Sequence, residues 1–186
     1  MAENYTTYTE VDPNSRITVT SATRIDYTNI ARNESAYVYK DKGAAYYSGD
    51  FDFDVDVIAT AGHASTSVTY PVGLANTIND LYNIVITGDA LVAQFNATTT
   101  YTQFVLRESV SGTNYTASSA QLSLSTTYYL TFRRDEAVGT YGTAYLDIYT
   151  DSGRTTLSET LTLALHVKTD FRYLYGFSSS NNGGVA

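Results

Sequence analysis

The chain has 186 residues, with 18 Tyr, 2 His, no Cys and no Trp, and its formal net charge is -8 at pH 7. This length suits one compact domain, and the absence of Cys excludes thiol nucleophiles, disulfides and cysteine-based zinc sites. The excess of acid opposes the counterion release that drives binding to phosphate backbones, so we expect no nucleic-acid partner. No apolar run reaches the roughly 18 residues of a membrane helix, so we expect no membrane insertion.

Apolar and polar residues alternate with a period of two between short clusters of Gly, Asp, Asn and Ser, which is typical of β-strands joined by turns. In chain order, the predicted strands cover residues 16–22, 36–40, 51–57, 67–73, 91–96, 102–109, 128–134, 143–150, 157–163 and 171–177. The predicted turns are Asp12–Asn14, Asp41–Gly43, Ser111–Asn114 and Asp151–Gly153. Residues 76–85 predict a loop with at most one helical turn, because Asn and β-branched residues weaken helices.

Many short strands, little helix and no linker composition indicate two packed antiparallel sheets. We therefore predict an all-β fold, a two-sheet antiparallel β-sandwich of the jelly-roll type. Residues 1–186 are expected to form a single jelly-roll domain.

Four segments carry a resemblance to a known family: Tyr47–Val57, Tyr128–Asp135, Ala144–Gly153 and Lys168–Gly176. Over residues 5–177 the chain resembles the concanavalin A-like lectin/glucanase superfamily, and it is most similar to the LamG-like modules of phage and environmental virion proteins. The resemblance implies a concanavalin A-like jelly roll whose members bind glycans or build extracellular and viral assemblies. Such modules usually close with a further strand, whereas this chain stops at Gly183-Gly-Val-Ala186. This difference predicts an open sheet edge that a neighbouring chain fills.

Three carboxylates, Asp52, Asp54 and Asp56, alternate with apolar residues and so share one face of a predicted strand. Their spacing resembles the acidic triplet of the family's glucanases. That triplet is built on Glu, and this chain has no Trp to line sugar subsites, so we expect no catalytic role. The row is either a solvated polar face or a binding site for a glycan or a partner. Because three adjacent carboxylates repel one another, calcium is a further candidate ligand.

A second candidate site is the predicted strand Ala144–Tyr149, in which Tyr145, Asp147 and Tyr149 should face outward. Tyrosine rings stack on the C–H faces of sugars while a carboxylate accepts sugar hydroxyls. The same row suits a protein interface, because Tyr is enriched there, and it also suits an ordinary exposed sheet surface.

The two histidines, His63 and His166, lie far apart in the sequence without ligand-spaced partners, and no Gly-x-Ser-x-Gly motif is present. We therefore predict no catalytic residue, no enzymatic activity and no cofactor apart from the candidate calcium ion. The leading hypothesis is a non-enzymatic structural or decoration module of a virion or extracellular surface. It would assemble with copies of itself or with other virion or surface proteins.

The alternative function is a glycan-binding, lectin-like module, and a glycoside hydrolase is the third candidate. The N-terminal residues have neither the basic region nor the apolar stretch of a classical export signal. We therefore expect the virion or the extracellular surface as the location.

Overall fold

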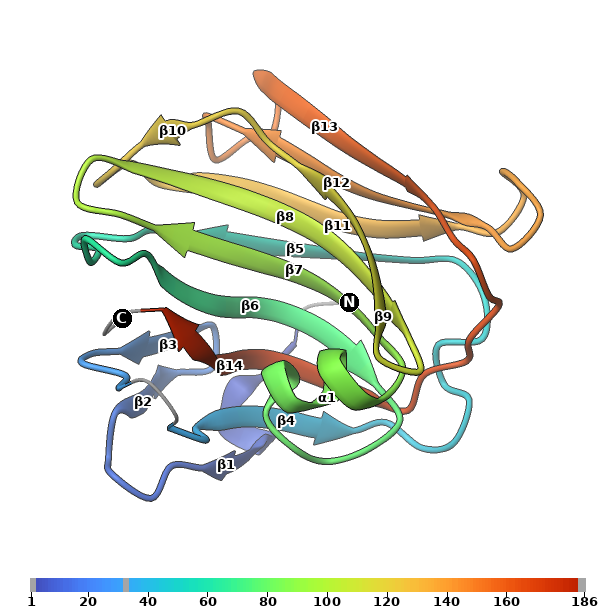
Figure 1. The fold of residues 1–186 in the computed structure, drawn as a ribbon, viewed down its shortest axis with the longest axis horizontal. Helices are drawn as coiled ribbons and strands as arrows, with labels where there is room; N and C mark the ends of the chain where they lie inside the picture. The colour runs from blue at the N-terminus through green and yellow to red at the C-terminus, as the bar shows by residue number, and fades with distance from the viewer. Residues whose placement is uncertain (1–2, 32–33, 184–186) are drawn as a thin grey trace.

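The computed structural model describes residues 3–31 and 34–183, and it confirms the all-β prediction (Figure 1). Its helices are the 3-10 helix η1 (Tyr5–Thr7) and the α-helix α1 (Leu81–Thr87). Neither is long and apolar enough to cross a membrane. The strands are β1 (Thr9–Val11), β2 (Ile17–Ser21), β3 (Arg24–Tyr27), β4 (Tyr37–Asp41), β5 (Phe51–Val57), β6 (Ser67–Ala75), β7 (Ala90–Ala97), β8 (Tyr101–Val110), β9 (Thr113–Ser118), β10 (Leu122–Ser123), β11 (Tyr128–Asp135), β12 (Thr143–Tyr149), β13 (Leu157–Ala164) and β14 (Tyr173–Gly183).

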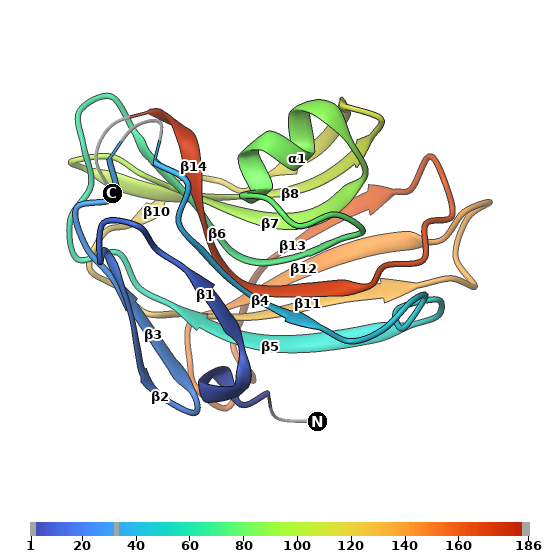
Figure 2. The same cartoon turned by 90° about the horizontal axis from the view of Figure 1, so that it is seen from below.

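Two antiparallel sheets pack face to face, as the sandwich prediction requires. The larger sheet has the order β1-β4-β14-β6-β7-β8-β10, with β9 also paired to β8, and the smaller sheet has the order β13-β12-β11-β5. The hairpin β2-β3 forms a separate ribbon beside the sandwich (Figures 1 and 2). The smaller sheet therefore has one face in the core and one face toward solvent.

The core between the sheets comes from the apolar positions of the alternating strands. Leu91 and Phe104 of the larger sheet and Phe132 and Leu146 of the smaller sheet belong to one buried cluster. Successive side chains of a strand point to opposite faces. Because the apolar residues of this cluster face the core, the residues between them on β5, β11 and β12 face outward. The predicted inward direction of Ala144, Leu146 and Ile148 is confirmed, since each of them is fully buried.

A helix covers the outer face of the larger sheet, where the sequence predicted a loop with at most one helical turn. Helix α1 begins after Asp80, whose Oδ1 accepts a hydrogen bond from the backbone N–H of Asn83 at 2.9 Å and so caps the helix. Its apolar residues Leu81, Ile84 and Val85 pack on the sheet. Tertiary burial therefore outweighs the weak helix propensity of this segment.

Strand β14 changes the direction of its side chains at Gly176. The pairing register with β4 shifts between Tyr175 and Phe177, which is a β-bulge. Uninterrupted alternation over residues 171–177 would put Tyr173 and Tyr175 on the same side as Phe171 and Phe177, but these four buried residues divide between clusters. The two tyrosines belong to the cluster under α1, whereas the two phenylalanines belong to two other clusters.

The predicted open edge near the end of the chain is not found at β14, because this strand pairs with β4 on one side and β6 on the other. The end of the chain on which the prediction of a missing closing strand rested, residues 184–186, lies outside the described residues.

Candidate functional site

All six predicted site residues lie on the outer face of the smaller sheet. The antiparallel registers of β5, β11, β12 and β13 align them into three rows that run across the strands. We call this surface the polar sheet face and define it by its rows: Asp52, Arg133, Tyr145 and Thr162; Asp54, Thr131, Asp147 and Thr160; Asp56, Tyr129, Tyr149 and Leu157. One strand, β11, separates the aspartates of β5 from the Tyr-Asp-Tyr row of β12.

Arg133 organises the middle of the polar sheet face. Its Nε donates a hydrogen bond to Asp147 Oδ2 at 2.8 Å, and its guanidinium carbon lies 3.9 Å from the ring centroid of Tyr145. The hydrogen bond to Asp147 raises the pKa of the Arg133 guanidinium. The other Asp147 oxygen accepts from Thr160 Oγ1 at 2.7 Å, and the residue is 7% exposed. Asp147 therefore positions Arg133 and, through Arg133, the ring of Tyr145. Both carboxylate oxygens of Asp147 already accept hydrogen bonds from protein groups.

Arg154, which the sequence did not single out, crosses the face from the loop between β12 and β13. Its Nη2 donates to Asp56 Oδ1 at 2.8 Å, and its Nε forms an ion pair with Asp54 Oδ1 at 3.2 Å. The guanidinium also lies 6.0 Å from the ring centroid of Tyr129. The only feature of the sequence that pointed to this region was the predicted turn Asp151–Gly153, directly before Arg154. A predicted turn does not show which strand the side chains near it contact.

The aspartate row is therefore partly neutralised by protein groups. Asp54 also accepts a hydrogen bond from Thr131 Oγ1 at 2.7 Å, whereas Asp52 has no ion-pair partner within the described chain. Among residues 3–31 and 34–183, no three His, Asp or Glu side chains lie close enough to hold a metal ion. Calcium binding by this row stays a prediction.

His166 has partners that its sequence context did not indicate. Its ring stacks on Tyr115 with 3.4 Å between the ring centroids, and its Nδ1 lies 2.9 Å from an oxygen of the buried Glu108. Glu108 also accepts the backbone N–H of His166 at 2.9 Å. His63 accepts the backbone N–H of Ser65 at 3.1 Å on its Nδ1. Neither histidine belongs to the polar sheet face: His166 joins its loop to β8 through Glu108, and His63 makes a local contact within its own loop.

The polar sheet face can contact a polyhydroxyl ligand in three ways. Half-buried rings at Tyr129, Tyr145 and Tyr149 provide flat apolar faces together with hydroxyl groups. Thr131 and the two threonines of β13 add further hydroxyls, and Arg133 is a charged donor. Arg133 and Arg154 pair with three of the four carboxylates on the face, which leaves Asp52 as the carboxylate without an ion-pair partner among the described residues.

Comparison with known proteins gives a fold relationship. No protein-family model matches the chain, and no curated protein matches it in sequence. Among solved structures, the chain is similar to full-length tailspike protein 2 of an Escherichia coli O157:H7 bacteriophage, with a TM-score of 0.58 and 12% identity over 100% of this chain and 24% of that one. It is also similar to the enzymatically active domain of tailspike protein 2 of bacteriophage CBA120, with a TM-score of 0.53 and 12% identity over 99% of this chain and 26% of that one.

These likenesses establish a shared fold, and the chain spans about a quarter of the length of either tailspike structure. The comparison contradicts the prediction that the chain has no enzymatic role, because one neighbour is an enzymatically active domain. The absence of thiol, histidine and Gly-x-Ser-x-Gly signatures and of a Glu triplet does not exclude catalysis by other groups. Activity depends on a site and not on a fold, so a missing motif from one family excludes little.

Proposed function

We propose that the chain is a glycan-binding module of a tailspike-type virion protein that degrades the glycan it binds. The observation that carries the proposal is the polar sheet face, on which three tyrosines, Arg133 and several threonines converge on one side of a rigid sheet. The fold shared with phage tailspike structures supports the virion location and the degrading activity. The concanavalin A-like assignment is compatible with the sandwich and stays part of this proposal.

The chemistry of the face suits sugars better than ions or lipids. A pyranose ring has C–H faces that pack on tyrosine rings and equatorial hydroxyls that pair with hydroxyl and guanidinium groups. Tyr145 is held by Arg133, and Asp147 in turn fixes Arg133, so the stacking platform is ordered before a ligand arrives. Preorganised side chains lose little conformational entropy on binding, which favours affinity.

The same face also suits contact with copies of the chain or with other virion proteins, because tyrosine and arginine are enriched in interface cores. We favour the glycan for this face because it is rich in hydroxyl groups and contains a single exposed large aliphatic residue, Leu157, within its defined set. A protein interface of ordinary affinity has a more apolar centre.

A polysaccharide array with the pure protein tests the proposal. We expect binding to at least one bacterial surface polysaccharide and release of shorter oligosaccharides from it. Tyr145→Ala and Tyr149→Ala should each weaken binding at least about tenfold, since loss of an aromatic anchor costs about 2 kcal/mol or more. Tyr82→Ala is the matched control, because Tyr82 is also half-buried but lies on α1, over the other sheet.

Two results would contradict the proposal. One is that no polysaccharide in the array binds the protein. The other is that binding occurs and is equal in the wild type, Tyr145→Ala and Tyr149→Ala, which would place the glycan elsewhere. Analytical ultracentrifugation of the same samples reports any self-association through the face.

A further inference from the structure

Strand β5 is an edge strand of the smaller sheet. It pairs with β11 on one side and, among the described residues, with no strand on the other. An edge strand leaves a row of backbone N–H and C=O groups unpaired, and proteins usually protect such an edge with charged side chains, especially Lys, or with Pro, a bulge or a short strand. The sequence of β5, Phe51–Val57, has seven residues without Lys or Pro, and its pairing with β11 shows no register shift.

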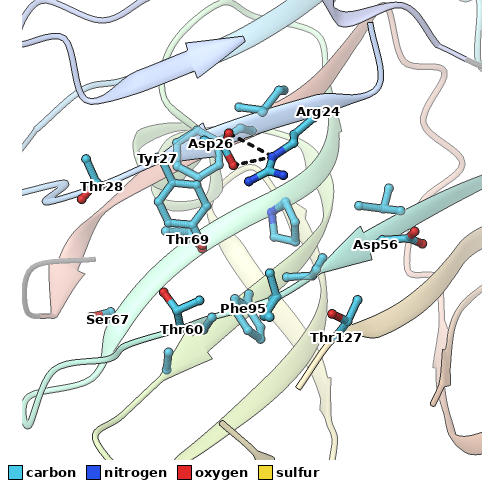
Figure 3. A pocket seen from close by; sticks show the side chains of 18 of the residues that line it. Arg24, Asp26, Tyr27, Thr28, Asp56, Thr60, Ser67, Thr69, Phe95 and Thr127 are labelled. Carbon is cyan, nitrogen blue, oxygen red and sulfur yellow. Dashed lines mark hydrogen bonds and ion pairs between the residues drawn. The ribbon is translucent and has the colours of Figure 1, made fainter. Parts of the chain in front are cut away.

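Two cavities follow the free side of β5, one of about 360 Å³ along Asp52–Val55 and one of about 830 Å³ along residues 55–62. We call them together the edge cleft. Both are lined by Tyr5, Thr23, Val55 and Gly176, so they adjoin one another. Figure 3 shows the larger cavity, with Arg24 and Asp26 on one side and Asp56 and Thr127 on the other. The space next to β5 is therefore a cleft that the hairpin β2-β3 borders without pairing to the strand.

The floor of the edge cleft is apolar. Val72 and Leu174 line the smaller cavity, and Phe95 and Phe177 line the larger one. A strand placed next to β5 would direct every second side chain toward this floor, because side chains alternate between the faces of a sheet. Apolar residues at those positions would extend the core between the two sheets.

The outer rim of the edge cleft is acidic. Arg24 is the one basic residue in the lining. The lining includes five carboxylates: Glu3, Asp26, Asp52, Asp54 and Asp56. Arg24 pairs with Asp26, Lys42 with Glu3, and Arg154 with Asp54 and Asp56. Asp52 has no such partner in the described chain. Cross-strand neighbours on one face lie about 4.5–5.5 Å apart at Cβ, so a new strand would place its outward side chains beside the aspartates of β5.

We propose that the edge cleft binds an extended segment of a partner protein, which pairs with β5 and adds a strand to the smaller sheet. The segment alternates basic residues, which face Asp52, Asp54 and Asp56, with apolar residues, which cover the floor. Such strand addition takes its affinity from main-chain hydrogen bonds and its specificity from alternate side chains. A second copy of this chain, with a net charge of -8, is the less favourable occupant of an acidic rim, so we assign the cleft to a basic segment of a different protein. The three aspartates also belong to the polar sheet face, but the inference rests on the free edge of β5 and the cleft beside it and does not require that a glycan binds.

Fluorescence anisotropy with labelled peptides tests the inference on the full chain. The probe is a capped Lys-Val-Lys-Val-Lys-Val-Lys peptide, and we expect saturable binding. Two control peptides should bind at least about tenfold more weakly. A peptide of the same composition with all four Lys residues first cannot direct Lys to the acidic rim and Val to the apolar floor at alternate positions. A Glu-Val alternating peptide is repelled by the aspartates. Equal binding of the two Lys peptides would overturn the inference, since it would show a general charge attraction.

Variants of the chain locate the peptide. Asp52→Lys should weaken binding about tenfold, because a repulsive cross-strand pair replaces an attractive one. Glu10→Lys makes the same charge change on β1, the edge strand of the larger sheet, and should leave binding within about twofold of the wild type. Asp54→Asn only removes a charge and serves as the second variant if Asp52→Lys does not fold.

Hydrogen exchange reports the pairing itself. Amides within residues 51–57 should become protected when the peptide binds, because strand addition satisfies the free edge. Absence of this protection in the saturated complex, or peptide binding that Asp52→Lys and Asp54→Asn leave unchanged, would overturn the inference. Binding of an oligosaccharide in the cleft in place of the peptide would overturn it as well, without affecting the proposal for the polar sheet face.

Discussion

The guanidinium carbon of Arg133 lies 3.9 Å from the ring centroid of Tyr145, its register neighbour on the adjacent strand. A cation over an aromatic face is attracted by the quadrupole of the ring and also restricts its rotation. The same guanidinium holds Asp147 through a 2.8 Å hydrogen bond. One residue of β11 therefore contacts two of the three side chains of β12 that the sequence assigned to ligand binding.

Replacing Arg133 with Ala should lower the free energy of unfolding by about 1–2 kcal/mol, because Asp147 would remain nearly buried with Thr160 as its only side-chain partner. Arg24→Ala is the control, since the Arg24–Asp26 pair is exposed, and it should change stability by less than about 0.5 kcal/mol. Urea denaturation measures both values. Equal effects of the two substitutions would contradict a special role for Arg133.

The core contribution of β12 can be measured at Leu146, which is fully buried between the sheets. Leu146→Ala should cost about 2–5 kcal/mol of unfolding free energy, because it removes buried methyl groups and leaves a cavity. Leu157→Ala removes the same atoms at a position that is 53% exposed, so it should cost less than about 0.5 kcal/mol. Thermal and urea unfolding of the two variants should differ accordingly, and similar losses would show that the sandwich core is misassigned.

Gly62 allows a close approach of two loops. A Cβ at this position would lie 2.2 Å from the backbone oxygen of Thr98, and backbone atoms cannot move aside as a side chain can. We expect Gly62→Ala to lower the free energy of unfolding by about 1–3 kcal/mol through overpacking. A Cβ at Gly49 meets nothing within 4 Å, so Gly49→Ala should be nearly neutral. A neutral Gly62→Ala variant would show that these loops are further apart.

The acid side of the stability profile should depend on Asp41. Hydrogen bonds from Arg172 and from the backbone N–H of Gly43 lower the pKa of Asp41 from 3.8 to about 2. A lowered pKa in the folded state means that the unfolded state binds more protons, so this stabilisation is present above about pH 4 and is lost as the pH falls toward 2. Asp41→Asn should therefore show a shallower loss of stability between pH 4 and pH 2 than the wild type. Parallel pH profiles for the two proteins would contradict the assignment.

The alternation of residues predicted most of the sheet architecture. The segments Phe51–Val57 and Thr143–Tyr149 are strands whose large apolar residues share one face, partly buried in the first and buried in the second, with polar residues on the other face. The strands and the faces of their residues could be predicted because period-two patterning and turn residues involve only neighbouring positions in the sequence. The outward direction of the six candidate residues followed from the same patterning, and the strand registers then place them on one surface.

Features that depend on distant contacts were missed. Strand β9 begins at Thr113, which was assigned to a turn, because Ser111 and Gly112 alone form the turn, both with positive φ. The bulge at Gly176 reverses the side-chain parity of β14, and period-two reasoning has no signal for an extra residue. The reach of Arg154 to Asp56 joins positions 98 residues apart in the chain. The edge cleft depends on the position of the hairpin β2-β3, which a different part of the sequence from β5 forms.

Nuclear magnetic resonance titration with the tightest-binding oligosaccharide from the array would locate the glycan on the protein. If the polar sheet face is the glycan site, the largest backbone shift changes should cluster at Tyr129, Tyr145 and Tyr149 and their register neighbours, and they should disappear in Tyr149→Ala. Shift changes that cluster on α1 or along the edge cleft, with the three tyrosines unaffected, would contradict it.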